Sequence, residues 1–245
     1  MLKNKNILIT GSSSGIGLAT ARLAKAYGAN VIVHGQIDSP ELQKIAEELG
    51  AEKIFCDISD KEAVFGEIQK LLDKKIQIDC LANVAGVVKT RSSFLESTEE
   101  EWISNYKVNV LGIVYMCQAL IPHMQMNKYG KIVNVASIRA HPQGAVSTRM
   151  PYSAAKAGVV NITAALAKEY AKDGITVVSV SPGGVNTEIA KSWDEATIKR
   201  NSNVPLGRIA EPKEIAEAIC FFLSDKSSYA TGSDFLFDGG YIIGN

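Results

Sequence analysis

The sequence predicts an α/β protein with a doubly wound parallel sheet of about seven strands covered by helices on both faces. Short apolar runs alternate with helical patterns along all 245 residues, which is typical of a parallel sheet. The first apolar run ends in a glycine-rich turn that opens a helix, an arrangement that binds phosphate groups. Because no linker, repeat or composition shift divides the chain, we expect one domain over residues 1–245.

Each expected element follows from its pattern. The strands are short apolar runs that end at turn residues, as buried parallel strands do. They are expected at residues 6–10, 31–34, 53–56, 78–83, 131–136, 174–180 and 234–237. The helices are expected at residues 18–27, 40–49, 61–73, about 98–125 with an interruption at Pro122, 151–172 and 212–223. Residues 188–205 have no regular pattern and are expected to form a lid over the substrate.

Composition excludes several classes of partner. Lys plus Arg equals Asp plus Glu at 26 each, so neither a nucleic-acid nor a membrane-surface partner is expected. No apolar run approaches the ~20 residues that cross a bilayer, and residues 7–9 are too short a run for a signal peptide. The four cysteines make no C-x-x-C pair, so we expect reduced core residues in a cytoplasmic protein, and no metal site.

The glycine turn after the first strand is the first candidate site. Gly11, Gly15 and Gly17 have the spacing G-x-x-x-G-x-G. Glycines let the backbone approach a ligand, and the free N–H groups of the following helix face an anion. Ligands of such sheets bind outside the carboxyl ends of the strands. Residues 83–86, Ser137 and residues 182–187 follow other strands at that same edge, so these segments should converge on a dinucleotide.

The end of the second strand bears on the choice of cofactor. An acid there holds the ribose diol of NAD, whereas a nearby Arg accepts the 2′-phosphate of NADP. Here the positions hold His34, Gly35 and Gln36, with neither an acid nor a basic side chain. Because no acid repels a phosphate, we favour NADP(H) over NAD(H), with acceptance of either cofactor as the alternative. Asp57, after the third strand, accepts a bond from the adenine amino group or caps the next helix.

Tyr152 and Lys156 form the candidate catalytic pair. Four residues separate them in a predicted helix that begins at Pro151, so both side chains lie on one face. A phenol normally loses its proton near pH ~10, and a neighbouring ammonium stabilises the phenolate. Such a tyrosine can protonate a carbonyl oxygen or deprotonate an alcohol. The pair alone is also compatible with a half-buried aromatic beside a surface lysine.

The ordered set of motifs resembles the short-chain dehydrogenase/reductase family in its classical, single-domain form. The resemblance extends over nearly the whole chain, and the order of the motifs makes it specific. The matching segments are Thr10–Gly17, Asp57, Asn83–Gly86, Asn109, Ser137, Tyr152–Lys156, Pro182–Thr187, Leu206–Arg208, Pro212, Glu214–Ala216 and Asp238–Gly240.

The resemblance implies a Rossmann-type fold and NAD(P)-dependent hydride transfer between a secondary alcohol and a ketone. It implies that Ser137 steadies the substrate oxygen, Tyr152 is the general acid/base, Lys156 lowers the phenol pKa and binds the nicotinamide ribose, and Asn109 holds a water. The expected cofactor contacts are Gly11, Ser13, Ser14, Gly15, Ile16, Gly17, His34, Gln36, Asp57, Ile58, Asn83, Ala85, Gly86, Tyr152, Lys156, Pro182, Gly183, Val185 and Thr187.

Two features depart from the usual pattern. The usual N-N-A-G reads N-V-A-G here, and the interval from Ser137 to Tyr152 is somewhat long. Arg139 and Arg149 in that interval are expected either to pair with a substrate carboxylate or phosphate or to be solvated loop residues. Ile189 and Trp193 are expected to line the substrate pocket from the lid.

The expected substrate is a small ketone or alcohol. The protein is expected to form a homotetramer or homodimer. A 3-oxoacyl-[acyl-carrier-protein] reductase is one alternative, although no basic cluster for an acidic carrier is evident near the lid. A sugar, polyol or hydroxy-acid dehydrogenase is equally compatible. In a different class, the chain could be a non-catalytic dinucleotide-sensing protein, against which the intact Ser137, Tyr152 and Lys156 argue. The sequence does not identify the substrate or the physiological direction.

Overall fold

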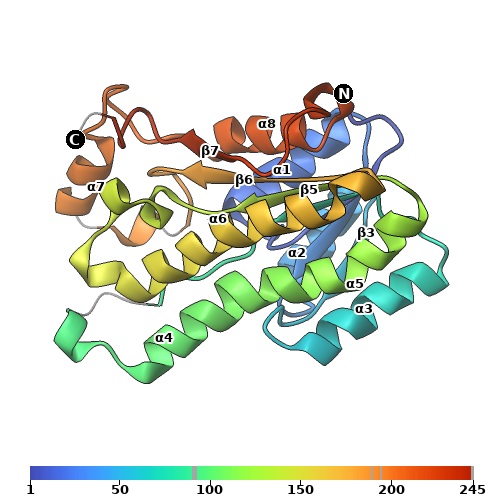
Figure 1. The fold of residues 1–245 in the computed structure, drawn as a ribbon, viewed down its shortest axis with the longest axis horizontal. Coiled ribbons are helices and arrows are strands. Elements are labelled where there is room, and N and C mark those ends of the chain that lie inside the picture. The colour runs from blue at the N-terminus through green and yellow to red at the C-terminus, as the bar shows by residue number, and fades with distance from the viewer. Residues whose placement is uncertain (90–92, 189, 194, 244–245) are drawn as a thin grey trace.

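The computed structural model describes residues 1–89, 93–188, 190–193 and 195–243 (Figure 1). Seven parallel strands form one sheet in the order β3-β2-β1-β4-β5-β6-β7, which confirms the predicted fold class. The strands are β1 (Asn6–Ile9), β2 (Asn30–Gly35), β3 (Glu52–Phe55), β4 (Cys80–Asn83), β5 (Gly130–Val135), β6 (Ile175–Pro182) and β7 (Asp234–Phe237). Strand order reverses between β1 and β4, and in such sheets ligands bind at that crossover.

Helices cover both faces of the sheet. One face carries α1 (Gly15–Ala26), α2 (Pro40–Leu49) and α8 (Pro212–Phe222). The other carries α3 (Lys61–Asp73), α5 (Gly112–Met126) and α6 (Met150–Tyr170). In Figure 1, α1 and α8 lie above the sheet, with α3, α5 and α6 below it. Two further helices, α4 (Glu99–Tyr106) and α7 (Glu195–Ser202), lie toward the left of that view, where α4 packs on α6.

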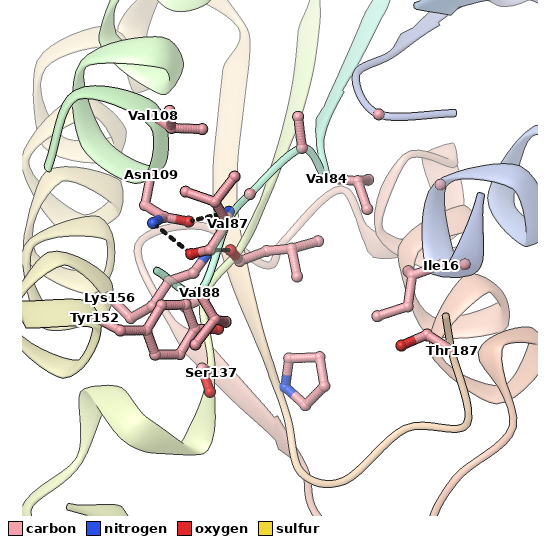
Figure 2. A pocket seen from close by; sticks show the side chains of 18 of the residues that line it. Ile16, Val84, Val87, Val88, Val108, Asn109, Ser137, Tyr152, Lys156 and Thr187 are labelled. Atoms are coloured by element: carbon pink, nitrogen blue, oxygen red, sulfur yellow. Dashed lines mark hydrogen bonds between the residues drawn. The ribbon is translucent and has the colours of Figure 1, made fainter. Parts of the chain in front are cut away.

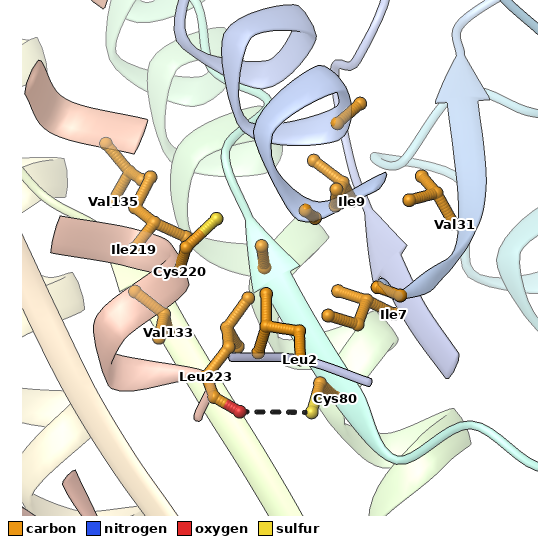
Figure 3. Packing of buried hydrophobic residues seen from close by; sticks show 14 of the residues in the cluster. Leu2, Ile7, Ile9, Val31, Cys80, Val133, Val135, Ile219, Cys220 and Leu223 are labelled. Carbon is orange, nitrogen blue, oxygen red and sulfur yellow. Dashed lines mark hydrogen bonds between the residues drawn. The ribbon is translucent and has the colours of Figure 1, made fainter. Parts of the chain in front are cut away.

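Both faces of the central strands are buried. On β1, Ile7 and Ile9 join the core beneath α1 and α8, and Leu8 between them joins the core beneath α3 and α5. Figure 3 shows the first of these cores, where the Cys80 thiol also donates to the carbonyl of Leu223 at 3.5 Å. Burial on both sides explains why these strands read as continuous apolar runs.

The helix expected at about 98–125 follows a different course. It runs from α4 through a π-helical turn, Lys107–Leu111, into α5, and it passes through Pro122 without a break. A proline removes one helical hydrogen bond, but the buried neighbours Leu120, Ile121 and Met124 hold this part of α5 against the core. The irregularity therefore lies at Asn109 instead of Pro122. Within the described ranges, no helix is long and apolar enough to cross a membrane.

Candidate active site

A cleft of about 510 Å³ lies at the carboxyl edge of the sheet. The glycine turn, the segments that follow β2 to β6 and the first turns of α6 line it. Figure 2 shows Tyr152, Lys156 and Ser137 on one side of this cleft, opposite Ile16 and Thr187. The structure thus brings the candidate catalytic pair to the same cavity as the glycine turn.

Most of the residues expected at the site line this cleft. They are Gly11, Ser14, Gly15, Ile16, Gly17, His34, Gln36, Asp57, Ile58, Ala85, Gly86, Asn109, Ser137, Arg139, Arg149, Tyr152, Lys156, Pro182, Gly183, Val185, Thr187 and Trp193. Ser13 and Asn83 do not line it. Asn83 is buried instead, and its amide donates to the Asn134 side chain at 2.8 Å across the sheet. Ile189 lies outside the described residues.

Close contacts with neighbouring backbone require glycine at positions of this turn. Gly11 has φ +66°, and a Cβ there would lie 2.9 Å from Cα of Ala85. A Cβ on Gly17 would lie 2.1 Å from the carbonyl oxygen of Gly11, so a side chain cannot be accepted without moving the turn. Ser14 at the N-cap of α1 makes no side-chain capping bond. The first N–H groups of α1 are therefore not capped by that side chain, and they can serve an anion.

Thr10 fixes the glycine turn against the loop after β4. Its hydroxyl oxygen accepts hydrogen bonds from the backbone N–H groups of Val84 and Ala85, at 2.9 and 3.0 Å. These residues are more than 70 positions apart in the chain. The two loops consequently form one rigid wall of the cleft.

His34 is a buried structural brace. Its Nδ1 accepts the backbone N–H of Gly11 at 3.1 Å, so the ring proton must be on Nε2. Nε2 in turn lies 3.1 Å from the carbonyl oxygen of Cys56, to which it donates. Burial lowers the pKa of His34, which keeps the imidazole neutral. His34, expected as a cofactor contact, lines the cleft and also links the glycine turn to the end of β3.

Asp57 lines the cleft and does not cap α3. That cap is Asp60, whose carboxylate accepts from the backbone N–H of Ala63. Asp57 accepts from the backbone and hydroxyl of Ser59 and from the amide of Gln36. Burial acts to raise the pKa of Asp57, but these hydrogen bonds outweigh it and hold the pKa below its ordinary value.

Asn109 lies at the π-helical turn and holds the loop after β4. Its amide Nδ2 donates to the carbonyl oxygens of Val87 and Asn105, at 2.9 and 3.0 Å, while Oδ1 accepts from the N–H of Val87 at 3.2 Å (Figure 2). A Cβ on Gly86 would lie 2.8 Å from Oδ1 of Asn109 and 3.5 Å from Nζ of Lys156. The backbone thus passes very close to Lys156, and the side-chain amide of Asn109 is occupied by backbone partners.

Lys156 is a buried cation. Its Nζ donates to the carbonyl oxygen of Val135, at the end of β5, at 2.7 Å. Burial lowers the pKa of Lys156 to about 8, because the charged form loses its hydration. Nζ lies 5.8 Å from the centre of the Tyr152 ring.

The pKa of Tyr152 is raised above its ordinary value, chiefly by burial. A hydrogen bond with the Ser137 side chain opposes this rise, as do the positive charges of Arg149 and Arg139. The expected acidifying effect of Lys156 on the phenol stays a prediction.

Arg139 is not the solvated loop residue that was one alternative. Its side chain is buried, and Nη1 donates to the carbonyl oxygen of Gly144 at 2.6 Å and to the Tyr241 hydroxyl at 3.4 Å. Trp193 also lines the cleft, and its indole N–H is buried with no acceptor in the described part of the chain. Arg149, the N-cap residue of α6, lines the cleft three positions before Tyr152.

Several residues that line the cleft were not anticipated. Val87 and Val88 directly follow the predicted segment 83–86, so their position in the sequence was the available signal. Ser104, Lys107 and Val108 come from α4 and the π-helical turn, and Asn201 from α7. No periodicity in the sequence indicates which face of these helices meets the cleft. Among the described residues, no group of three or more His, Cys, Asp or Glu side chains could hold a metal ion.

Comparisons with known proteins agree with this geometry. Residues 11–242 match a family model described as enoyl-(acyl carrier protein) reductase. The 3-oxoacyl-[acyl-carrier-protein] reductase FabG of Chlamydia trachomatis is 36% identical over 248 residues, with 98% of each chain covered. A (2S)-[(R)-hydroxy(phenyl)methyl]succinyl-CoA dehydrogenase subunit, BbsD of Thauera aromatica, is 38% identical and covers 98% of this chain and 97% of its own.

Solved structures give the same result. A putative gluconate dehydrogenase from Agrobacterium tumefaciens superposes with a TM-score of 0.93 at 26% identity, over 98% of this chain and 97% of that one. A protein described as a short chain dehydrogenase/reductase family protein superposes with a TM-score of 0.87 at 30% identity, over 99% of both chains.

The fold and the site define an oxidoreductase of the nicotinamide-dependent, Rossmann-type class. Within that class, the chain belongs to the short-chain dehydrogenase/reductase family, whose enzymes act on CH–OH groups.

Proposed function

We propose that the enzyme interconverts a secondary alcohol and a ketone, with Tyr152 as general acid in reduction and general base in oxidation. The observation that supports this most directly is the position of Tyr152, Ser137 and Lys156 on one wall of the cleft, facing the glycine turn (Figure 2). A proton donor and an oxygen-binding hydroxyl thus adjoin the cofactor's expected position.

The residues of the cleft fit a nicotinamide dinucleotide. The turn has no side chain at Gly11, Gly15 and Gly17, and the Ser14 side chain does not cap α1, so backbone N–H groups can meet a diphosphate. The cofactor, when bound, supplies or accepts the hydride.

Each protein group has a distinct role in the proposal. Tyr152 gives its proton to the ketone oxygen, while Ser137 donates a hydrogen bond to the same oxygen. Lys156 uses one ammonium hydrogen for the carbonyl of Val135, which leaves two for the ribose hydroxyls of the cofactor. Asn109 is a positioning residue, because its amide holds the backbone of Val87 beside Lys156.

Turnover of a panel of ketones and secondary alcohols, followed by nicotinamide absorbance, tests this function. We expect wild-type turnover of some members, and a fall in kcat of at least about 10²-fold in Tyr152→Phe, because the proton donor is gone. Cofactor affinity should stay within about threefold of wild type, since the ring remains. Retained turnover in Tyr152→Phe would contradict the assigned role, and cofactor binding without any wild-type turnover would favour a dinucleotide sensor.

We infer NADP(H) as the preferred cofactor. The end of β2 presents neutral His34 and the amide of Gln36, so no carboxylate at these two positions repels a 2′-phosphate. Calorimetric titration should give a lower Kd for NADP⁺ than for NAD⁺. An equal or lower Kd for NAD⁺ would contradict the inference.

Residues 188–205 form the proposed lid. Support comes from Trp193 and Asn201, which line the cleft from this segment, and from α7, which lies within it. Closure of such a segment over the substrate would exclude water from the transfer.

A 3-oxoacyl-[acyl-carrier-protein] reductase is the second candidate. The observation in its favour is the 36% identity to FabG proteins over 98% or more of this chain. Turnover of a 3-oxoacyl thioester on an acyl carrier protein, with a KM well below that for the free thioester, would support it. Equal KM values would exclude carrier recognition.

A further inference from the structure

Arg139 is a charged side chain buried in the cleft without a carboxylate partner. The residue is only 6% exposed, and it lines the cleft two residues after Ser137. Arginine is rarely buried unless it is paired, because loss of hydration disfavours an isolated charge. Among the residues that the structure describes, no Asp or Glu lies within ion-pair distance of Arg139.

The guanidinium retains unused donors. Nη1 serves the Gly144 carbonyl and the Tyr241 hydroxyl, and the guanidinium carbon lies 5.5 Å from the centre of the Tyr241 ring. Nε and Nη2 of Arg139 have no acceptor in the described ranges. Neither atom is completely buried, so both remain accessible to a ligand. These contacts fix the guanidinium plane, and a fixed plane with free N–H groups matches the two oxygens of a carboxylate.

The cleft as a whole is positive. Among the residues that the structure describes, five cationic side chains, those of Lys89, Lys107, Arg139, Arg149 and Lys156, line it beside two carboxylates, those of Asp57 and Glu188. The whole chain has formal net charge +0, so this excess is local. Glu188 is already paired with Lys191 at 2.6 Å.

Part of this charge lies at the reacting end of the cleft. The diphosphate of a dinucleotide would be held at the glycine turn, opposite Tyr152 (Figure 2). Arg139 follows Ser137 by two residues, Arg149 precedes Tyr152 by three, and all four line the cleft. A cofactor phosphate therefore does not account for these two arginines.

We propose, on the basis of the function proposed above, that the substrate is a small oxo or hydroxy acid and that Arg139 binds its carboxylate a few bonds from the reacting carbon. One fixed guanidinium edge suits a planar carboxylate, whereas a phosphate monoester with nearly two charges would need further donors. A thioester substrate presents no charge near the reacting carbon, so the proposal also separates this enzyme from a carrier-protein reductase.

Matched substrate pairs test the proposal without any mutation. The probes are 2-oxobutanoate, 3-oxobutanoate and 5-oxohexanoate, each compared with its primary amide, which has a similar shape and no charge. We expect kcat/KM for at least one acid to exceed that of its amide by about 10-fold or more. An amide turned over as well as its acid at every chain length would overturn the proposal while leaving the oxidoreductase function standing.

The variant Arg139→Gln tests whether Arg139 causes the preference for an acid over its amide. It should bring the ratio of acid to amide close to one, chiefly by raising KM for the acid, while Arg139→Lys should keep part of the preference. Arg22→Gln is the matched control, since Arg22 is an exposed arginine of α1 paired with Glu48, and it should leave the ratio unchanged.

The outcomes remain distinguishable if Arg139→Gln folds poorly. A loss of activity toward acid and amide alike, in a variant with wild-type melting temperature, would overturn the assignment to Arg139. If Arg139→Gln melts at a lower temperature than wild type, the proposal is tested by the ratio of acid to amide in wild type and in Arg139→Lys. No turnover of any ketone by wild type, with either cofactor, would instead overturn the proposed function itself.

Discussion

Tyr152 and Lys156 lie one helical turn apart on α6, and burial moves their pKa values in opposite directions. The phenol pKa is raised and the ammonium pKa falls to about 8. Each shift disfavours the charged form, as expected where water is excluded. The spacing of the pair was readable from the sequence, but the burial was not, because it depends on β5 and on the loop after β4.

Replacement of Lys156 should separate stability from activity. We expect Lys156→Met to lose most turnover and to melt at a higher temperature than wild type at pH 7, because the buried charge costs of the order of 3 kcal/mol, less the lost bond to Val135. Calorimetry of both proteins across pH measures this difference.

The pH dependence has a defined sign. In the folded protein the pKa of Lys156 is about 8, against an ordinary value of 10.5. Between these values the unfolded chain binds more protons, so wild-type stability should rise with pH in that window and the advantage of Lys156→Met should shrink. A constant difference in melting temperature from pH 7 to pH 10 would contradict this.

At the scale of elements, the strand–turn–helix unit of β1 and α1 depends on glycines at closely packed positions. Its glycines were predicted as a phosphate cradle, and the structure adds a packing reason for them. Gly17 must lack a side chain because the first turn of α1 lies directly on the carbonyl of Gly11. The hydrogen bonds of Thr10 to the loop after β4 and of His34 to this turn join segments distant in sequence, so local patterns did not reveal them.

Gly17→Ala should destabilise the fold by about 2 kcal/mol or more and weaken cofactor binding at least about tenfold, because the added Cβ would displace the turn. Urea unfolding and cofactor titration measure the two effects. Gly66→Ala is the matched control on helix α3, where an added Cβ meets nothing within 4 Å. It should stabilise by about 0.5–1 kcal/mol through helix propensity. Similar effects of the two variants would refute the packing argument.

The long helix shows where sequence patterns misled. Pro122 indicated an interruption, whereas the structure places the irregularity in the π-helical turn at Lys107–Leu111. Such turns frequently occur at functional sites. Here the turn contains Asn109, whose amide binds the backbone of Val87. The change from α-helix to π-helix therefore occurs where the helix binds the loop after β4, which is a tertiary contact.

At the scale of the whole molecule, all four cysteines are free and buried, as their apolar surroundings predicted. Burial raises the pKa of Cys56, Cys117 and Cys220 to about 12 each and raises that of Cys80 as well. We expect the native protein to react with a thiol reagent much more slowly than the unfolded protein, since the thiolate is the reactive form. Rapid modification of any thiol in the native state would contradict the core assignment.

The proposed oligomer is a second property of the whole molecule. Large apolar side chains are exposed on α4 and just before it, among them Leu95 at 93% and Tyr106 at 52%. Such a surface is typical of an interaction site. Sedimentation should give a dimer or tetramer, and Tyr106→Glu should shift it toward monomer, while Tyr229→Glu, at an exposed aromatic away from α4, should shift it less. A wild-type monomer at micromolar concentration would refute the proposal.

The sequence by itself determined the alternation of strands and helices, the glycine turn and the spacing of Tyr152 and Lys156. Each of these features is a pattern within a short stretch of sequence, so it can be recognised without knowledge of the tertiary structure. Only the tertiary structure decided that His34 braces the glycine turn, that the helix becomes π-helical around Asn109 and that Arg139 is buried without a described carboxylate. Each of these depends on which distant segments meet, as Arg139 meets Tyr241, and burial and hydrogen-bond partners exist only once those segments are packed.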